Sequence, residues 1–198
     1  MTKNSRKQNL SDQELINPQF DERGYIQVYT GDGKGKTTAS LGLTMRALGR
    51  GWNVLIVMFT KGGTNYGELY SFKELMQNLS NKLKIVQAGV DRIVYSSNIN
   101  DEDQVAIAKG WDIAKDAAKS NEYKLIVLDE INIAIDLGLI EINDVKDFLQ
   151  NKPLDLEIVM TGRRAHPEIV EIAHLVSEIK PIKHYWDIGI PAREGIEF

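Results

Sequence analysis

A glycine-rich run early in the chain limits the folds that are open to it. Residues 30–38 read Thr-Gly-Asp-Gly-Lys-Gly-Lys-Thr-Thr, between a strand-like run at 24–29 and a helix-like run at 39–48. In that order, glycines allow backbone N–H groups to turn toward phosphate oxygens, and the helix adds its positive dipole end. The run therefore predicts a nucleoside triphosphate site of the phosphate-loop type. The alternative is a glycine-rich turn that binds no ligand.

The spacing within this loop assigns a role to single positions. Lys36 falls where a phosphate loop places its phosphate-binding lysine, and Thr37 falls where it places its metal-binding hydroxyl. A strict G-x-x-x-x-G-K-[ST] motif would begin with glycine where this chain has Thr30. A dinucleotide fingerprint fits worse, because Lys36 stands at its third glycine. The expected nucleotide-binding positions are Thr30, Gly31, Asp32, Gly33, Lys34, Gly35, Lys36, Thr37 and Thr38.

Bulk properties narrow the class of protein. With 198 residues, of which 42% are hydrophobic, the chain is long enough for one well-packed α/β domain. A formal charge of −4 argues against coating nucleic acid or an anionic membrane. Zero cysteines exclude thiolate ligands and nucleophiles and suit a reducing compartment. The apolar stretches are too short to span a bilayer, so we expect a cytoplasmic protein.

Short apolar runs alternate with amphipathic stretches, which predicts crossover units that build a mostly parallel sheet. The expected architecture is an α/β three-layer fold of the RecA-like P-loop NTPase type, with a central sheet flanked by helices. The predicted strands are 25–30, 53–59, 84–87, 125–128, 157–160 and 175–179, and the predicted helices are 36–49, 68–79, 101–119, 143–150 and 167–174. Asn143 is expected to cap its helix, His166 is read as a cap residue, and Trp52 and Trp111 are expected in the core.

The chain divides into an N-terminal extension, residues 1–23, and a domain at 24–198. Ser11–Glu14 form a capping-box pattern ahead of Leu15 and Ile16, which indicates a short helix. A disordered tail is the alternative for this extension.

Two acids end the apolar run at 125–128. Asp129 and Glu130 would reach the same sheet edge as Thr37, and carboxylate and hydroxyl oxygens suit Mg²⁺ beside a polyphosphate. The alternative is that the acids cap a following helix at 131–137. Lys34 would add a second cation near the phosphates, or else be a solvated loop lysine.

Later segments reach the same edge. Thr60–Gly63 follow the second strand, either as a loop that approaches a ligand or as an ordinary connection. Arg163, just past the fifth strand, could grip a phosphate.

Five segments, taken together, resemble the P-loop type of cob(I)alamin or cob(I)yrinic acid a,c-diamide adenosyltransferase. The resemblance runs from about Gly24 to the C-terminus, and a threonine before Gly31 is similar to that family's own form of the loop. The segments that carry it are Tyr29–Thr38, Phe59–Gly62 with Gly67-Glu68, Val127–Glu130, Thr161–Arg163, and Lys183-His184 with Gly195–Phe198.

The resemblance implies transfer of the 5′-deoxyadenosyl group of ATP to the Co(I) of a reduced corrinoid, with tripolyphosphate leaving. It implies Lys36, Thr37 and Glu130 as catalytic residues, Lys61 and Arg163 at the nucleotide, and Mg²⁺ held by Thr37, Asp129 and Glu130. It further implies a homodimer, an N-terminal segment over the corrinoid site, and a separate flavoprotein reductant that supplies Co(I).

The chain departs from better-known members at two places. Val90–Ile93 replace an aromatic pair, and Thr64-Asn65-Tyr66 stand where those members carry a tryptophan after the Phe59–Gly62 segment. Tyr95, Tyr185 and Trp186 are the candidate aromatic residues for the role of the pair. Two other functions use the same loop and acids: a small-molecule kinase with Arg163 or Arg164 as its charge clamp, and a nucleotide-switched binding protein.

Overall fold

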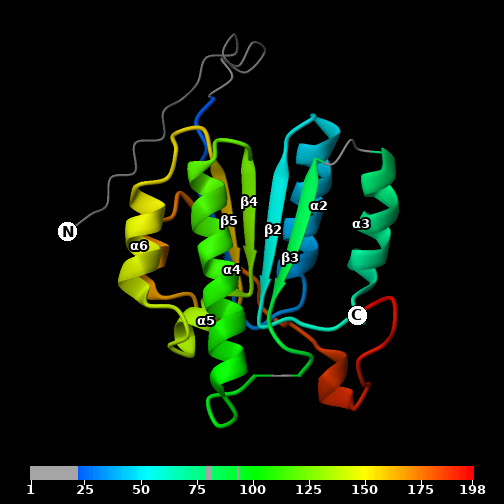
Figure 1. Ribbon diagram of the computed structural model, residues 1–198. Helices are drawn as coiled ribbons and strands as arrows, with labels where there is room; N and C mark the ends of the chain where they lie inside the picture. Colours follow the sequence, from blue (N-terminus) through cyan, green and yellow to red (C-terminus); the bar gives the residue numbers. More distant parts are fainter. Residues whose placement is uncertain (1–21, 79–81, 93) are drawn as a thin grey trace, which may run out of the picture.

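The computed structural model describes residues 22–78, 82–92 and 94–198 (Figure 1). The helix expected at Ser11–Ile16 lies outside these residues. Six strands form one sheet in the order β3-β2-β4-β5-β1-β6, and every pairing is parallel. The strands are β1 (Ile26–Thr30), β2 (Val54–Phe59), β3 (Leu83–Ala88), β4 (Leu125–Asp129), β5 (Glu157–Thr161) and β6 (Leu175–Glu178).

Helices cover both faces of the sheet and make the molecule three-layered (Figure 1). One face carries α2 (Lys36–Gly49) and α3 (Gly67–Asn78). The other face carries α4 (Asp101–Lys119), α5 (Ile131–Asp136), α6 (Ile142–Gln150) and α7 (Pro167–Ile172). A short 3₁₀ helix, η1 (Tyr185–Ile188), follows β6. The predicted α/β three-layer fold is confirmed.

The central strands read as unbroken apolar runs because both of their faces are buried. In β2, Leu55 and Val57 belong to the core beneath α4, whereas Val54 and Ile56 belong to the core beneath α2 and α3. This alternation follows from the two-residue period of a strand. Trp111 of α4 is buried in the first core, as predicted.

The six predicted strands and five predicted helices are present, with boundaries that differ by at most two residues. Two local predictions are wrong. Asn143 does not cap α6, because the helix already begins at Ile142, after Glu141, and no side chain caps it. Trp52 is 39% exposed, because it lies in the turn between α2 and β2 rather than inside either element.

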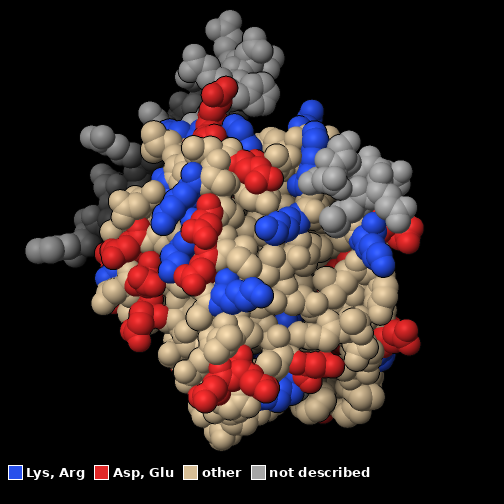
Figure 2. Space-filling model, in the orientation of Figure 1, with Lys and Arg blue, Asp and Glu red and all other residues tan. Residues whose placement is uncertain are grey.

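Charged side chains of both signs are interspersed over the face that carries α4 and α6 (Figure 2). Among the described residues, none of the helices has the length and apolar character that crossing a membrane requires. Because all six strands are parallel, their carboxyl ends meet at one edge of the sheet, at the bottom of Figure 1. Open α/β sheets bind ligands at that edge.

Candidate active site

A cleft of about 1190 Å³ lies at the carboxyl edge of the sheet. Its walls come from the loop before α2, the loop between β2 and α3, the segment after β3, the start of α5, the loop after β5, and the C-terminal residues. The predicted site residues that line it are Asp32, Gly33, Lys34, Gly35, Lys36, Thr37, Thr38, Lys61, Glu130 and Arg163. The other three, Thr30, Gly31 and Asp129, are not among the lining residues.

The glycines of the phosphate loop are required by a neighbouring segment as well as by any ligand. Gly31 has φ 94°, and a Cβ there would lie 2.4 Å from the Ile179 carbonyl oxygen. Gly33 donates its N–H to the same oxygen at 2.8 Å. Gly35, at the start of α2, has φ 122° and open space where a Cβ would be. Ile179, which follows β6, therefore packs against the phosphate loop and fixes its conformation.

Thr30 has a structural reason to replace the first glycine of the motif. Its hydroxyl oxygen accepts a hydrogen bond from the Ala165 N–H at 3.2 Å. This bond ties the end of β1 to the loop after β5, which carries Arg163. A glycine at this position would lack the acceptor.

Lys36 folds back over its own loop. Its ammonium donates to the carbonyl oxygens of Gly31 at 2.7 Å and Gly33 at 2.8 Å, and the residue is 7% exposed. Burial lowers the pKa of Lys36, and the nearby Glu130 carboxylate offsets part of that effect. A buried cation that is bonded to neutral carbonyls gains from an added anion, which is what a phosphate-binding lysine needs.

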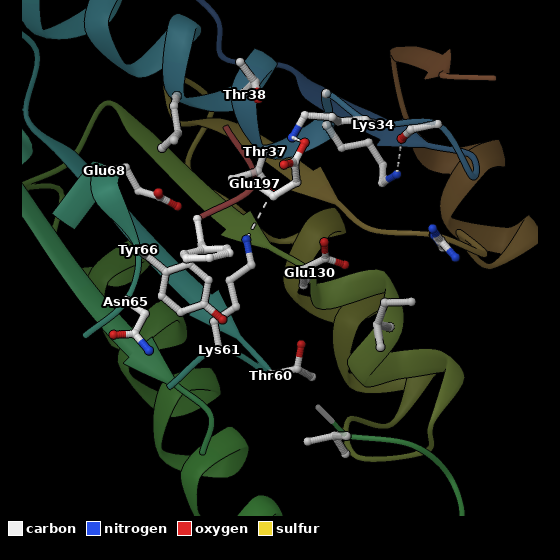
Figure 3. Close-up of a pocket in the computed structure, with 18 of the residues that line it drawn as sticks. Lys34, Thr37, Thr38, Thr60, Lys61, Asn65, Tyr66, Glu68, Glu130 and Glu197 are labelled. Carbon is white, nitrogen blue, oxygen red and sulfur yellow. Dashed lines mark hydrogen bonds and ion pairs between the residues drawn. The ribbon is translucent and has the colours of Figure 1, made fainter. Parts of the chain in front are cut away.

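Asp129 is the centre of a buried polar cluster beneath the cleft. The hydroxyls of Thr37 and Thr161 donate to its Oδ1 at 3.0 and 2.7 Å. The Lys61 ammonium lies 2.6 Å from the Asp129 Oδ2. The same ammonium lies 3.2 Å from the Thr37 Oγ1, and Figure 3 shows Lys61 and Thr37 side by side. Side chains from α2, from the end of β5 and from the loop after β2 therefore converge on Asp129, which is 1% exposed.

Lys61 is a strongly held cation. Burial alone would lower the pKa of Lys61, but the Asp129 charge and hydrogen bond outweigh it, so the pKa lies above its ordinary value. Two glycines allow the loop that carries Lys61 to pack closely against the segment after β3. A Cβ at Gly62 would lie 2.4 Å from the Val90 backbone, and a Cβ at Gly89 would lie 2.3 Å from the backbone nitrogen of Lys61. This close contact between two loops fixes where the Lys61 side chain begins.

Glu130 is not used as a helix cap. It precedes α5 in the left-handed conformation, φ 59°, and its side chain makes no capping hydrogen bond. Its N–H donates to the Thr161 hydroxyl at 2.9 Å, which links it to the Asp129 cluster. Burial, followed by the charge of Asp129, raises the pKa of Glu130 above its ordinary value. A carboxyl group in that state favours a nearby cation.

The other two predicted cations, Lys34 and Arg163, also have hydrogen-bond acceptors within the protein. Lys34 donates to the Ile196 carbonyl at 2.8 Å and lies 3.5 Å from the Glu197 carboxylate. Arg163 donates to the Asp32 carbonyl at 3.4 Å and lies 3.8 Å from its carboxylate. Lys34, Lys36, Lys61 and Arg163 thus face one cleft, and each has an internal acceptor.

Sequence reasoning missed several residues of the site. Thr161 was named as part of a segment that resembles the family, but its hydroxyl contact with Asp129 was not foreseen. Tyr66 and Glu197 also line the cleft, and neither was predicted as a site residue. Tyr95, one of the candidate aromatics, lines the cleft and is 59% exposed. Of the three candidate aromatics, Tyr185 and Trp186 are not among the lining residues. The C-terminal contact was signalled only by the family resemblance of Gly195–Phe198.

His166 and His184 each cap a helix. His166 caps α7 by accepting the Glu168 N–H through Nδ1, as predicted. His184 caps η1 in the same way, accepting from Trp186, and also lines the cleft.

Comparison with known proteins identifies the family of the chain. Residues 22–198 match the family described as ATP:corrinoid adenosyltransferase BtuR/CobO/CobP. The chain is 33% identical over 193 residues to a corrinoid adenosyltransferase of Pseudomonas aeruginosa, covering 98% of this chain and 92% of that protein. It is 38% identical over 180 residues to an uncharacterized Nostoc protein, covering 87% of this chain but spanning about half, 48%, of that relative's length.

The fold also has a solved counterpart. The flagellar accessory protein FlaH of Methanocaldococcus jannaschii superposes with a TM-score of 0.52 at 16% identity, covering 85% of this chain and 76% of that one. At that identity the likeness concerns the fold alone. The family match over residues 22–198 is independent of it, and by that match the chain belongs to the ATP:corrinoid adenosyltransferase family.

Proposed function

We propose that the protein transfers the 5′-deoxyadenosyl group of ATP to the Co(I) of a reduced corrinoid and releases tripolyphosphate, in adenosylcobalamin synthesis or salvage. One observation carries this proposal. Segments that are far apart in the sequence, and that were recognised as family motifs, line one cleft: the phosphate loop, the loop with Lys61, Glu130, Arg163 and Gly195–Phe198. A generic nucleotide site would require only the phosphate loop and an acid.

Four cations are suited to holding the leaving group. Lys36 lies beneath the phosphate loop, Lys61 beside Thr37, and Lys34 and Arg163 at the rim. Substitution at the C5′ carbon expels an intact triphosphate, so charge accumulates on the phosphate chain as the bond breaks. Cations placed in advance stabilise that charge without reorganisation in the transition state.

The residues present fit a magnesium ion. Thr37 and Asp129 supply hard oxygens within 3.0 Å of each other, and Glu130, the residue after Asp129, is a second acid that lines the cleft. The Lys61 ammonium already lies at the Asp129 carboxylate, which shows that this position favours a positive charge. Thr37, Asp129 and Glu130 would hold the ion, leaving other positions to water and phosphate oxygens. When bound, Mg²⁺ would neutralise phosphate oxygens of the leaving group.

The reaction demands little acid–base chemistry from the protein. Co(I) is itself the nucleophile, so the role of the chain is to hold C5′ toward the metal and to exclude water. We propose that the corrinoid contacts Tyr95, Ile133 and Leu137, which are among the residues that line the cleft. Tyr95 is then the aromatic residue best placed to replace the missing aromatic pair.

Other features of the proposal concern the whole protein. We propose residues 24–198 as the catalytic domain, with residues 1–23 as an extension that covers the corrinoid. The proposed protein is a cytoplasmic homodimer, and a separate flavoprotein reductant supplies its Co(I). The family match over residues 22–198 supports the extent of the catalytic domain. The other features follow from the sequence and its resemblance to the family.

The test is an anaerobic incubation of the protein with MgATP and chemically reduced cobalamin. We expect the absorbance spectrum of an alkyl-cobalt corrinoid, which reverts on illumination because light breaks the cobalt–carbon bond. A reaction with the Lys36→Ala variant serves as the control for uncatalysed alkylation. Formation of ADP and a phosphorylated acceptor, with no alkyl-cobalt product, would support a kinase instead.

A further inference from the structure

The last six residues fold into a compact unit, which we call the C-terminal turn (Arg193–Phe198). The Arg193 carbonyl accepts from the N–H groups of Ile196 at 3.2 Å and Glu197 at 2.9 Å, and the Gly195 N–H donates to the Phe198 carbonyl at 2.7 Å. The Glu197 carboxylate accepts from the Arg193 N–H at 2.8 Å and from its guanidinium at 3.3 Å. These local bonds allow the turn to move as one piece.

The C-terminal turn is held against the cleft by a few contacts. The Arg193 guanidinium lies 4.6 Å from the centre of the Tyr185 ring. A Cβ placed on Gly67 would lie 3.9 Å from the Phe198 backbone, so the turn reaches the start of α3, as Figure 1 also shows. On its other side, Lys34 of the phosphate loop bonds to the Ile196 carbonyl and lies near the Glu197 carboxylate.

The contact with Lys34 brings a negative charge beside the phosphate site. Glu197 is drawn in Figure 3 among the side chains that line the cleft, and its carboxylate is 3.5 Å from the Lys34 ammonium. A bound triphosphate would compete with Glu197 and the Ile196 carbonyl for Lys34, because charge-assisted bonds to phosphate are stronger than a bond to a neutral carbonyl. The triphosphate would also repel the Glu197 carboxylate.

We propose that the C-terminal turn is a strap that closes on Lys34 when the cleft is empty and is displaced when a triphosphate takes that lysine. The proposal rests on the proposed function, since it requires the phosphates at this loop. Displacement opens the cleft wall next to α3 while nucleotide is bound. After tripolyphosphate leaves, Lys34 returns to Ile196 and Glu197, and the wall closes again.

The strength of the Lys34–Glu197 ion pair depends on how far its two side chains are exposed to solvent. The side chains of Lys34 and Glu197 are 37% and 21% exposed, so solvent screens their attraction. Partly exposed pairs of this kind shift an equilibrium by about 2- to 5-fold. By linkage, removing the Glu197 charge should strengthen the binding of a ligand that displaces the strap by the same factor.

The first experiment measures the dissociation constant of MgATP by titration calorimetry. We expect Glu197→Gln to bind about 2- to 5-fold more tightly than the unchanged protein. Glu194→Gln, which removes the same charge from an exposed residue of the same turn, should change binding less. In a Lys34→Met background the effect of Glu197→Gln should shrink, because only the direct repulsion between Glu197 and the triphosphate remains.

The outcomes separate the strap from the proposed function. Equal affinities for Glu197→Gln and the unchanged protein, or the same gain in the Lys34→Met background, would overturn the strap alone. Failure of the unchanged protein to bind MgATP at all would overturn both proposals. Weaker binding by Glu197→Gln would also overturn the strap, because it would make the turn a wall that supports the nucleotide.

A second measurement follows the strap directly. The chain has no cysteine, so Lys73→Cys on α3 and Glu194→Cys in the turn would give a unique pair for spin labels. Lys73 and Glu194 are both exposed. We expect the distance between the labels to lengthen when MgATP is added, and an unchanged or shorter distance would overturn the proposal.

Discussion

Replacing Lys61 with methionine tests how the cluster beneath the cleft is stabilised. The substitution keeps most of the side-chain volume but removes the ammonium that lies 2.6 Å from Asp129 Oδ2. Asp129 is 1% exposed and the Lys61 side chain 16% exposed, so the pair is largely buried. Removing one partner of a buried pair leaves the other charge without compensation.

The expected cost can be worked out from these contacts. Breaking a buried ion pair costs about 3–5 kcal/mol. The Thr37 and Thr161 hydroxyls would still donate to Asp129, and Lys61 is partly hydrated, so we expect the lower value, about 3 kcal/mol. In a protein of this size, 1 kcal/mol corresponds to about 2–4 °C, so the melting temperature should fall by about 6–12 °C.

Thermal unfolding followed by circular dichroism measures this change. Lys180→Met is the matched control, because the Lys180 ammonium lies 3.0 Å from Glu178 but both side chains are more than half exposed. That control should lose less than about 1 kcal/mol. A Lys61→Met variant no less stable than Lys180→Met would refute the claim that a buried ion pair holds the cluster together.

Other substitutions test single features of the site and the fold. Lys36→Ala should slow adenosyl transfer by about 10²- to 10³-fold, measured as the rate of alkyl-cobalt formation, because it removes a preorganised cation. Thr30→Val should lower the free energy of unfolding by about 1 kcal/mol, measured by urea denaturation, because the Ala165 N–H loses its acceptor. Gly42→Ala, at an open position of α2, should raise it by about 1 kcal/mol, whereas Gly31→Ala should lower it sharply, because a Cβ would lie 2.4 Å from a carbonyl oxygen. Full activity in Lys36→Ala, unchanged stability in Thr30→Val, or a stable Gly31→Ala would each contradict the corresponding step.

Much of the fold follows from local patterns in the sequence. The central strands β2 and β4 are apolar runs with both faces buried, and each long helix has an amphipathic period. The six strands and five helices could therefore be predicted to within two residues. The order Gly35-Lys36-Thr37 at the start of α2 likewise fixed the phosphate loop. The prediction for Trp52 was wrong because a large apolar side chain suggests burial, whereas the turn between α2 and β2 leaves Trp52 at the surface.

The contacts within the site depend on residues that are far apart in the chain. Lys34 meets Ile196 across 162 residues, and Lys61 meets Asp129 across 68. A single sequence can place each residue at the sheet edge, but it cannot say which partner an individual side chain reaches. Thr30 shows the same limit, since its departure from the strict motif is explained by a backbone N–H on another loop, 135 residues away.

The central claim is that the phosphate chain of ATP leaves as one unit from the cleft at the carboxyl edge of the sheet. Phosphorus NMR of the products, after anaerobic reaction of the protein with MgATP and a Co(I) corrinoid, tests this directly. The account predicts one intact tripolyphosphate for each corrinoid that is alkylated. Release of ADP or free phosphate in place of tripolyphosphate would contradict it.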